Sequence, residues 1–118
     1  MAYEALDFYD IDSLLTDEER MIRDVVRDWV EERILPNIED ACREGVFPDE
    51  WRAEIGEMGI LGAPLKGYGC PGLSYTAYGL ICQELERGDS GVRSFARVQG
   101  SLAMYPIWDF GSEEQKEK

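Results

Sequence analysis

The chain has 118 residues, of which 25 are acidic, 12 are Lys or Arg and none is histidine, so its formal net charge is -13. This length predicts one compact domain, and the 44% hydrophobic fraction suits a folded soluble protein rather than a disordered one. The acidic balance argues against nucleic-acid binding, and the missing histidine excludes Ser-His and Cys-His catalytic dyads.

The three cysteines lie far apart, at Cys42, Cys70 and Cys82, and none belongs to a CxxC motif. They therefore indicate neither a disulfide framework nor a structural zinc site, and we expect reduced thiols that are mostly buried. No apolar run approaches the roughly 18 residues of a membrane span. The first twelve residues contain four acidic side chains and no basic one, which is the reverse of a targeting peptide.

The first predicted helix begins at a capping box in which the side chains of Thr16 and Glu19 each accept a hydrogen bond from the other's backbone amide. Apolar side chains recur at helical spacing through residues 22–30, and Pro36 should end or kink the helix. Residues 1–50 carry 16 acidic and 5 basic side chains, so this half should present a solvated acidic helical face.

Glycines and capping residues divide the rest of the chain into further helices, and no stretch alternates with the period of two that marks a strand. A short helical continuation beyond Pro36 should stop at Gly45, and a further helix should run from about Pro48 to Met58. The next helix should run from Ser74 to the break at Gly88, and the one after it from Asp89 or Ser90 to Gly111. A capped helix start at Ser112 is left incomplete, so the chain reads as the N-terminal piece of something longer. We predict an all-α fold, an orthogonal or up-down bundle of about five to six helices.

Two motifs favour structural roles. Residues 67–72 match G-x-G-x-x-G, but Pro71 removes one amide, Pro64 disfavours a preceding strand, and no βαβ unit surrounds them. We therefore predict a tight loop between helices rather than a dinucleotide site. The aromatic side chains of Tyr105, Trp108 and Phe110 are predicted to belong to the core or to an interface.

A cationic island lies at residues 87–97, where an acidic chain carries three arginines. Arg93 and Arg97 are four residues apart, so on a helix they share a face and repel one another unless an anion or carboxylate lies between them. The charge pattern alone favours internal pairing with Glu86 and Asp89 over an anion-binding site.

Three segments carry a resemblance to a known family: Lys66–Gly72, Ala77–Leu80 and Glu84–Ser94. They read KGYGCPG, AYGL and ELERGDSGVRS, and further matching pieces follow in the family's order up to Gln115. Over nearly its whole length the chain closely resembles the acyl-CoA dehydrogenase family, and within it the glutaryl-CoA dehydrogenase branch.

The resemblance implies that residues 1–118 are the N-terminal helical domain of a three-domain flavoprotein. In that family a middle β-domain and a C-terminal helical domain bind FAD, a glutamate of the C-terminal domain removes the α-proton, and hydride passes to the flavin. No position matches that glutamate, so no catalytic residue is assigned, and no residue is assigned to FAD or to a metal. The resemblance further implies an electron-transfer flavoprotein as acceptor, a homotetramer when full length, and a location in the bacterial cytoplasm or the mitochondrial matrix.

The same resemblance implies a substrate site. In the glutaryl-specific branch an arginine of the Asp-Ser-Gly-x-Arg-Ser segment holds the substrate's distal carboxylate, which gives that role to Arg93. Glu86 and Ser94 match residues that orient or accompany it, and Arg97 and Val98 complete the predicted substrate-binding set. Arg97 departs from the branch, where a small hydroxyl residue is usual, and its charge could contract the pocket, strengthen anion binding or point outward.

The implied reaction is oxidation and decarboxylation of glutaryl-CoA to crotonyl-CoA. Two alternatives stay open. The first is the N-terminal domain of a general short-chain acyl-CoA dehydrogenase or oxidase, although related oxidases lack the arginine at position 93. The second is a stand-alone, non-enzymatic helical docking domain.

Overall fold

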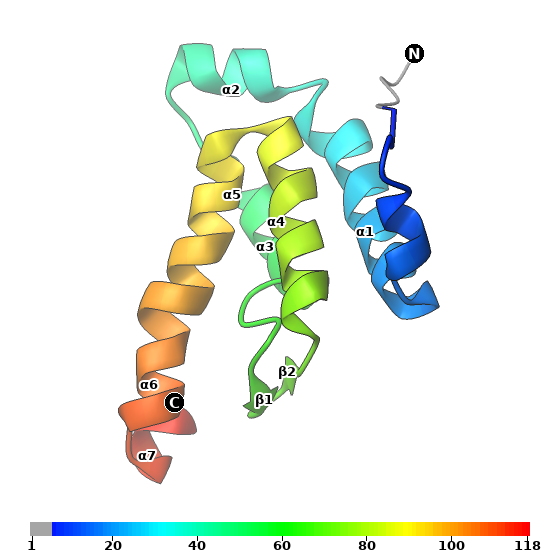
Figure 1. The fold of residues 1–118 in the computed structure, drawn as a ribbon. Helices are drawn as coiled ribbons and strands as arrows, with labels where there is room; N and C mark the ends of the chain where they lie inside the picture. The colour runs from blue at the N-terminus through cyan, green and yellow to red at the C-terminus, as the bar shows by residue number, and fades with distance from the viewer. Residues whose placement is uncertain (1–5) are drawn as a thin grey trace.

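The computed structural model describes residues 6–118 as a helical bundle with one small β-hairpin (Figure 1). Residues 1–5, which belong to the acidic N-terminal segment, lie outside the described residues. The helices of the first half are η1 (Ile11–Leu14, a 3-10 turn), α1 (Asp17–Trp29), η2 (Val30–Ile34, π-helical), α2 (Ile38–Glu44) and α3 (Asp49–Glu57).

The second half begins with a hairpin and continues as helices. Its elements are β1 (Lys66–Gly67), β2 (Cys70–Pro71), α4 (Tyr75–Gly88), α5 (Ser90–Arg97), η3 (Val98–Met104, π-helical), α6 (Tyr105–Phe110) and α7 (Glu113–Lys116). Residues at the α5–η3 and η3–α6 junctions keep right-handed helical dihedral angles, so these three elements form one column beside α4 (Figure 1). The predicted all-α bundle is confirmed.

The local sequence signals mark the helix ends correctly. The Thr16 amide donates to the Glu19 carboxylate at 3.0 Å and the Glu19 amide donates to the Thr16 hydroxyl at 3.2 Å, which is the predicted capping box. Gly45 ends α2 with a φ of 67°, in the left-handed region that glycine adopts without strain. The second predicted capping box joins Ser112 and Gln115 at the start of α7.

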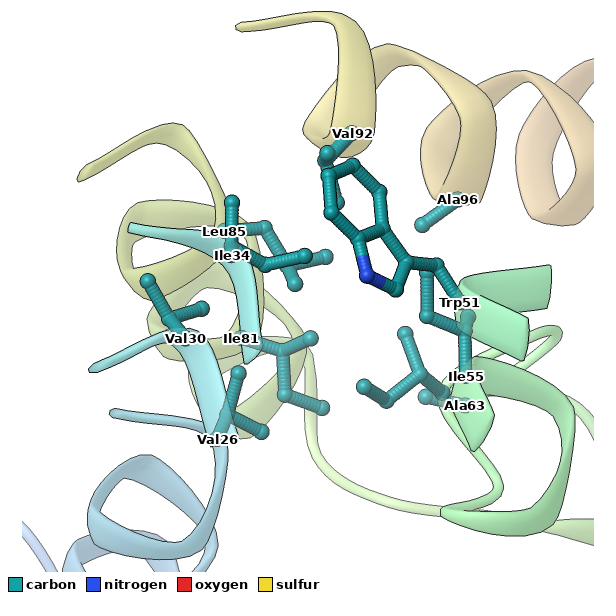
Figure 2. Packing of buried hydrophobic residues seen from close by; sticks show 11 residues of the cluster. Val26, Val30, Ile34, Trp51, Ile55, Ala63, Ile81, Leu85, Val92 and Ala96 are labelled. Atoms are coloured by element: carbon teal, nitrogen blue, oxygen red, sulfur yellow. The ribbon is translucent and has the colours of Figure 1, made fainter. Parts of the chain in front are cut away.

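The hydrophobic core lies between α1 with η2, α3, α4 and α5 (Figure 2). The indole of Trp51 on α3 reaches toward Val92 on α5, and Leu85 of α4 lies beside Ile34 of η2 (Figure 2). The buried members of this cluster are Val26, Val30, Ile34, Trp51, Ile55, Ile60, Ala63, Ile81, Leu85, Val92 and Ala96. Because α4 packs against α1, η2 and α5, this core holds the α4 and α5 backbones in a fixed relation.

One carboxylate is buried with the apolar core. Glu84 on α4 is 1% exposed, and its two oxygens accept from Arg27 on α1 at 2.8 and 3.1 Å and from Arg87 at 3.1 Å. A buried charge requires such pairing, so Glu84 ties α4 to α1.

The sequence prediction missed the hairpin and the π-helical turns. Strands of two residues are too short to show alternation, so the expectation of no strand is wrong at β1 and β2. The expectation of mostly buried thiols is wrong for Cys42, which is exposed, whereas Cys70 and Cys82 are partly buried and all three are free.

Candidate functional site

The candidate site lies along the seam where α5 runs back beside α4. Asp89 separates the two helices, and its carboxylate accepts from the amides of Gly91 at 2.7 Å and Val92 at 3.1 Å. This N-cap was one of the two predicted at the break, and it is the single residue between the end of α4 and the start of α5. The tight turn therefore brings the end of α4 against the first turns of α5.

Glu86 and Arg93 meet across this turn. The Arg93 Nε donates to Glu86 Oε2 at 2.6 Å, and the Ser90 hydroxyl donates to Glu86 Oε1 at 2.5 Å. Both carboxylate oxygens are thus occupied. Because the bond to Glu86 uses Nε, the two terminal nitrogens of Arg93 stay available for another acceptor.

These hydrogen bonds set the protonation states at the seam. The hydrogen bond from Ser90 and then the pairing with Arg93 hold the pKa of Glu86 below its ordinary value of 4.5. Arg93 in turn has a raised pKa, chiefly because of its hydrogen bond to Glu86. At neutral pH the site therefore contains an ionised carboxylate and a permanently charged guanidinium.

Two further polar side chains stand in the same row of α4. Tyr78, Cys82 and Glu86 follow one another at intervals of four residues, so they share a helix face. The Tyr78 hydroxyl is buried, and its polar neighbour is the Cys82 thiol one turn further along α4. Burial raises the pKa of Tyr78 and the pKa of Cys82, and the charges of Arg93 and Arg97 oppose both shifts.

The other predicted site residues follow Arg93 along the same column. Ser94 is half-buried on α5, Arg97 is exposed at the end of α5, and Val98 is 50% exposed at the first position of η3. Within residues 6–118 Arg97 forms no ion pair. The structure therefore joins Glu86 to Arg93 and leaves Ser94, Arg97 and Val98 beside them without a direct bond to that pair.

The predicted cationic island is divided. Arg87 turns to the opposite side, where it bonds Glu84 and donates to Glu31 on η2 at 3.0 Å. Asp89 caps α5 instead of pairing with an arginine. The prediction that Glu86 pairs with an arginine is confirmed, and the prediction that Asp89 does so is wrong.

Ser90 and Tyr78 were not among the predicted site residues. Ser90 follows Glu86 by four residues, and that spacing is a visible signal for a side-chain bond across the break. The burial of the Tyr78 hydroxyl has no sequence signal, because it depends on Gly100 of η3, which is distant in sequence. A Cβ placed on Gly100 would lie 3.9 Å from that hydroxyl oxygen.

The glycine motif forms the hairpin. Tyr68 and Gly69 have φ values of 53° and 79°, the pattern of a type I′ turn, and Pro71 pairs with Lys66. Because α4 begins only at Tyr75, no helix N-terminus follows the motif directly. The described residues therefore do not fit a dinucleotide cradle. They also contain no cluster of potential metal ligands, and no described helix is long and apolar enough to cross a membrane.

Of the aromatic residues near the end of the chain, Trp108 lines a surface cavity between α6 and the hairpin. Phe110 is 83% exposed, so the prediction that it belongs to the core is wrong, and an interface role stays a prediction. The Trp108 indole donates to the Lys66 carbonyl at 2.8 Å and ties α6 to the hairpin. A cavity of about 350 Å³ lies between them, lined by Leu65, Tyr68, Cys70, Met104, Ile107 and Trp108 among others.

Comparisons with known proteins agree with this fold. Residues 16–118 match the family model described as the acyl-CoA dehydrogenase N-terminal domain. A glutaryl-CoA dehydrogenase from Mycobacterium smegmatis in complex with FADH2 superposes with a TM-score of 0.90 at 50% identity, covering 94% of this chain and 29% of that one. The butyryl-CoA dehydrogenase of Megasphaera elsdenii gives a TM-score of 0.81 at 31% identity, covering 95% and 29%.

Among curated proteins, the probable acyl-CoA dehydrogenase YngJ of Bacillus subtilis is 35% identical over 106 residues, covering 87% of this chain and 27% of that protein. The chain thus spans less than a third of the length of these relatives. It belongs to the acyl-CoA dehydrogenase family, whose N-terminal domain it matches.

Proposed function

We propose that residues 1–118 form the N-terminal domain of a flavin-dependent acyl-CoA dehydrogenase that acts on glutaryl-CoA, and that the Glu86–Arg93 seam is one wall of its acyl pocket. The observation that carries the proposal is the Arg93 guanidinium, which Glu86 holds by Nε so that its terminal nitrogens stay available. The 50% identity to a glutaryl-CoA dehydrogenase, against 31% to a butyryl-CoA dehydrogenase over similar coverage, supports the same substrate.

The chemistry of the seam suits a dicarboxylic acyl thioester. A guanidinium presents parallel N–H donors that match both oxygens of a carboxylate, and an arginine fixed by Glu86 loses little freedom on binding. Such a contact discriminates against a plain acyl chain, because the terminal nitrogens of Arg93 would lose water without gaining an acceptor. The bound carboxylate would also be placed for its loss as carbon dioxide after oxidation.

The redox step would belong to other parts of the protein. FAD, when bound by the middle and C-terminal domains, supplies the hydride acceptor, and a carboxylate outside this chain would take the α-proton. The residues of this chain would bind and orient the distal end of the substrate. We also propose an electron-transfer flavoprotein as electron acceptor, a homotetrameric enzyme, and a cytoplasmic or mitochondrial-matrix location.

The test joins residues 1–118 to the middle and C-terminal domains of the Mycobacterium smegmatis relative and replaces Arg93 with Leu. We expect the ratio of kcat/KM for glutaryl-CoA to that for butyryl-CoA to fall about ten- to hundredfold, as loss of a charge-assisted bond worth about 1.5–3 kcal/mol requires. Arg43→Leu is the matched control, because within the described residues Arg43 pairs only with Asp40, at the exposed surface of α2. Equal losses on both substrates in Arg93→Leu would refute the role of Arg93 in selectivity.

A short-chain acyl-CoA dehydrogenase is the second candidate. Short-chain enzymes from Megasphaera elsdenii and Rattus norvegicus are 32% and 30% identical to this chain. A panel of acyl thioesters distinguishes a short-chain acyl-CoA dehydrogenase from a glutaryl-CoA dehydrogenase. The highest kcat/KM on butyryl-CoA would favour the short-chain enzyme.

A further inference from the structure

Helix α7 is one turn long among the described residues, and nothing in its backbone stops it there. The capping box at its start is complete, since the side chains of Ser112 and Gln115 each accept from the other's amide. Beyond the turn, Glu117 keeps right-handed helical dihedral angles, and its amide donates to the Glu113 carbonyl at 3.1 Å. Helix α2, in contrast, ends at a glycine in the left-handed region. A helix continued past Lys118 would therefore keep the axis of α7.

Hydrogen bonds hold α6 and α7 against the hairpin. The Tyr68 hydroxyl, at the turn between β1 and β2, donates to the carboxylate of Glu113, the first residue of α7. The Trp108 indole of α6 donates to the Lys66 carbonyl of β1 at 2.8 Å. Because both helices are anchored on the hairpin, the direction in which α7 leads the chain is fixed relative to α6.

The cavity of about 350 Å³ between α6 and the hairpin also reaches α7. Its apolar lining comes from the chain before the hairpin and from the η3–α6 column: Leu65, Met104, Ile107 and Trp108. Gln115, Lys116 and Lys118, at the α7 end, are polar residues of the same lining. A hollow with such an apolar wall is stabilised when apolar side chains fill it, because both surfaces then leave water.

Exposed apolar side chains of α6 enlarge this surface. Ile107 is 49% exposed and Phe110 is 83% exposed. A second cavity, of about 510 Å³, is lined by both of them and shares Ile107, Gln115 and Lys118 with the first. Because soluble proteins rarely leave a large contiguous apolar patch uncovered, this end of the column indicates a surface that another segment covers.

The segment that follows Lys118 in a longer chain is the one placed to cover this surface. The matched regions are 29% of the glutaryl-CoA dehydrogenase chain and 27% of YngJ, so most of each relative lies outside them. On a helix, residues three or four positions after Gln115 and Lys116 lie on the same face as these two. The first two residues after Lys118 would therefore face the cavity that Gln115 and Lys116 line.

We propose that this cavity seats the segment that follows Lys118 in the full-length enzyme, which continues α7 and buries its first apolar side chains against Ile107 and Trp108. The proposal rests on the proposed function only in that further domains follow residue 118, and it holds for any acyl substrate. The continued helix would anchor the junction between this domain and the next one on the hairpin.

The experiment compares residues 1–118 with an extended chain that adds the next part of the Mycobacterium smegmatis relative, about 15 residues or about four helical turns, directly after its matched region. NMR follows the indole N–H signals of the three tryptophans, and Trp108→Phe identifies the signal of Trp108. We expect the extension to shift this signal and to raise the urea midpoint by about 1 M, as burial of a large apolar side chain in a small domain predicts.

Two variants test where the extension binds. Ile107→Asp places a charge in the lining of the cavity, so the extension should lose most of its effect on the midpoint. Val46→Asp is the matched control, because Val46 is 54% exposed and follows α2, which lies at the opposite end of the molecule from α7 (Figure 1). In this variant the extension should raise the midpoint as it does in the wild type.

Several results would overturn the proposal. One is an extension that changes neither the Trp108 signal nor the midpoint, or that raises the midpoint equally in Ile107→Asp and the wild type. Another is a dimer of residues 1–118 in sedimentation that Ile107→Asp abolishes and the extension does not, since a second copy then fills the cavity. Octanoate that shifts the Trp108 signal equally in both chains would assign the cavity to a small apolar anion. A full-length enzyme that prefers butyryl-CoA to glutaryl-CoA would refute the proposed substrate alone, so the two failures are distinguishable.

Discussion

Glu86 fixes the direction of Arg93 because both of its oxygens are engaged. The Ser90 hydroxyl occupies Oε1, which leaves Oε2 for the Arg93 Nε and restricts rotation of the carboxylate. Positioning by a neighbouring hydroxyl is a common way to hold a charged group in one geometry before a ligand arrives. Ser90 thus acts on the site through Glu86.

Replacing Ser90 with Ala should raise the pKa of Glu86 toward its ordinary value of 4.5, because the Ser90 hydrogen bond is the largest cause that lowers it. In the wild type, ionised Glu86 stabilises the folded state above the pKa of the unfolded chain. This contribution disappears as the pH falls through the lower, folded-state pKa, and it should be smaller in Ser90→Ala.

Carbon-detected NMR titration of the Glu86 carboxyl measures this shift. Ser94→Ala is the control, since Ser94 is a nearby hydroxyl that forms no described bond to Glu86. A wild-type Glu86 that titrates at or above 4.5 would contradict the geometry described for the Ser90 and Arg93 bonds.

Helix α4 contains two glycines in opposite surroundings. A Cβ on Gly79 would meet no atom within 4 Å, whereas a Cβ on Gly88 would lie 2.8 Å from Val30 Cγ1 and 3.1 Å from Ile34 Cγ2. Gly88 therefore allows the end of α4 to approach η2, and that close approach precedes the turn that places Arg93 beside Glu86.

Gly88→Ala should destabilise the chain by about 1–3 kcal/mol, because the added methyl group overpacks the contact between α4 and η2. Gly79→Ala should stabilise it by about 0.4–1 kcal/mol, since alanine restricts the unfolded chain and favours a helix. Urea unfolding of both variants and the wild type gives the two differences. Similar effects of the two substitutions would show that η2 does not pack closely on Gly88.

At the scale of single helices, the sequence predicts the helix ends that residues within one turn determine. The capping boxes at Thr16 and Ser112 and the stop at Gly45 depend on residues within one turn, and all three are confirmed. The π-helical turns and the burial of Glu84 were not predictable, because Glu84 meets Arg27 across 57 residues of sequence. For the site, the Glu86–Arg93 pair could be predicted from the charge pattern and the resemblance, but the burial of the Tyr78 hydroxyl could not.

The whole molecule is a flat slab rather than a sphere. Its extents are 48 × 41 × 18 Å, and its radius of gyration of 15.4 Å exceeds the value of about 13.5 Å expected for a compact domain of this length. An 18 Å thickness corresponds to about two layers of helices, so many apolar side chains lie at the surface. The core nevertheless connects η2, α3, α4 and α5 in one cluster.

Because one cluster joins these elements, residues 1–118 should unfold in urea as a single cooperative unit, with an m-value of about 1–3 kcal/mol/M. Circular dichroism reports the helices, and tryptophan fluorescence reports the core through buried Trp51. Trp108→Phe serves as the background for fluorescence, since Trp108 lies at the hairpin outside the core cluster. Two separate midpoints would show that the hairpin end and the core fold independently.

The number of residues in the π-helical segment η3 sets how far α6 is rotated relative to α5, because the three elements form one continuous column. A π-helical hydrogen bond joins residues i and i+5, one residue more than the i and i+4 of an α-helix. Deleting one residue between Val98 and Met104, with the winding of the rest of the column unchanged, would turn everything beyond the deletion by roughly 100° relative to α5. Trp108 would then leave the Lys66 carbonyl, whereas the Glu86–Arg93 seam would stay in place. The length of this one segment thus sets the relative orientation of the substrate seam and the hairpin end of the domain.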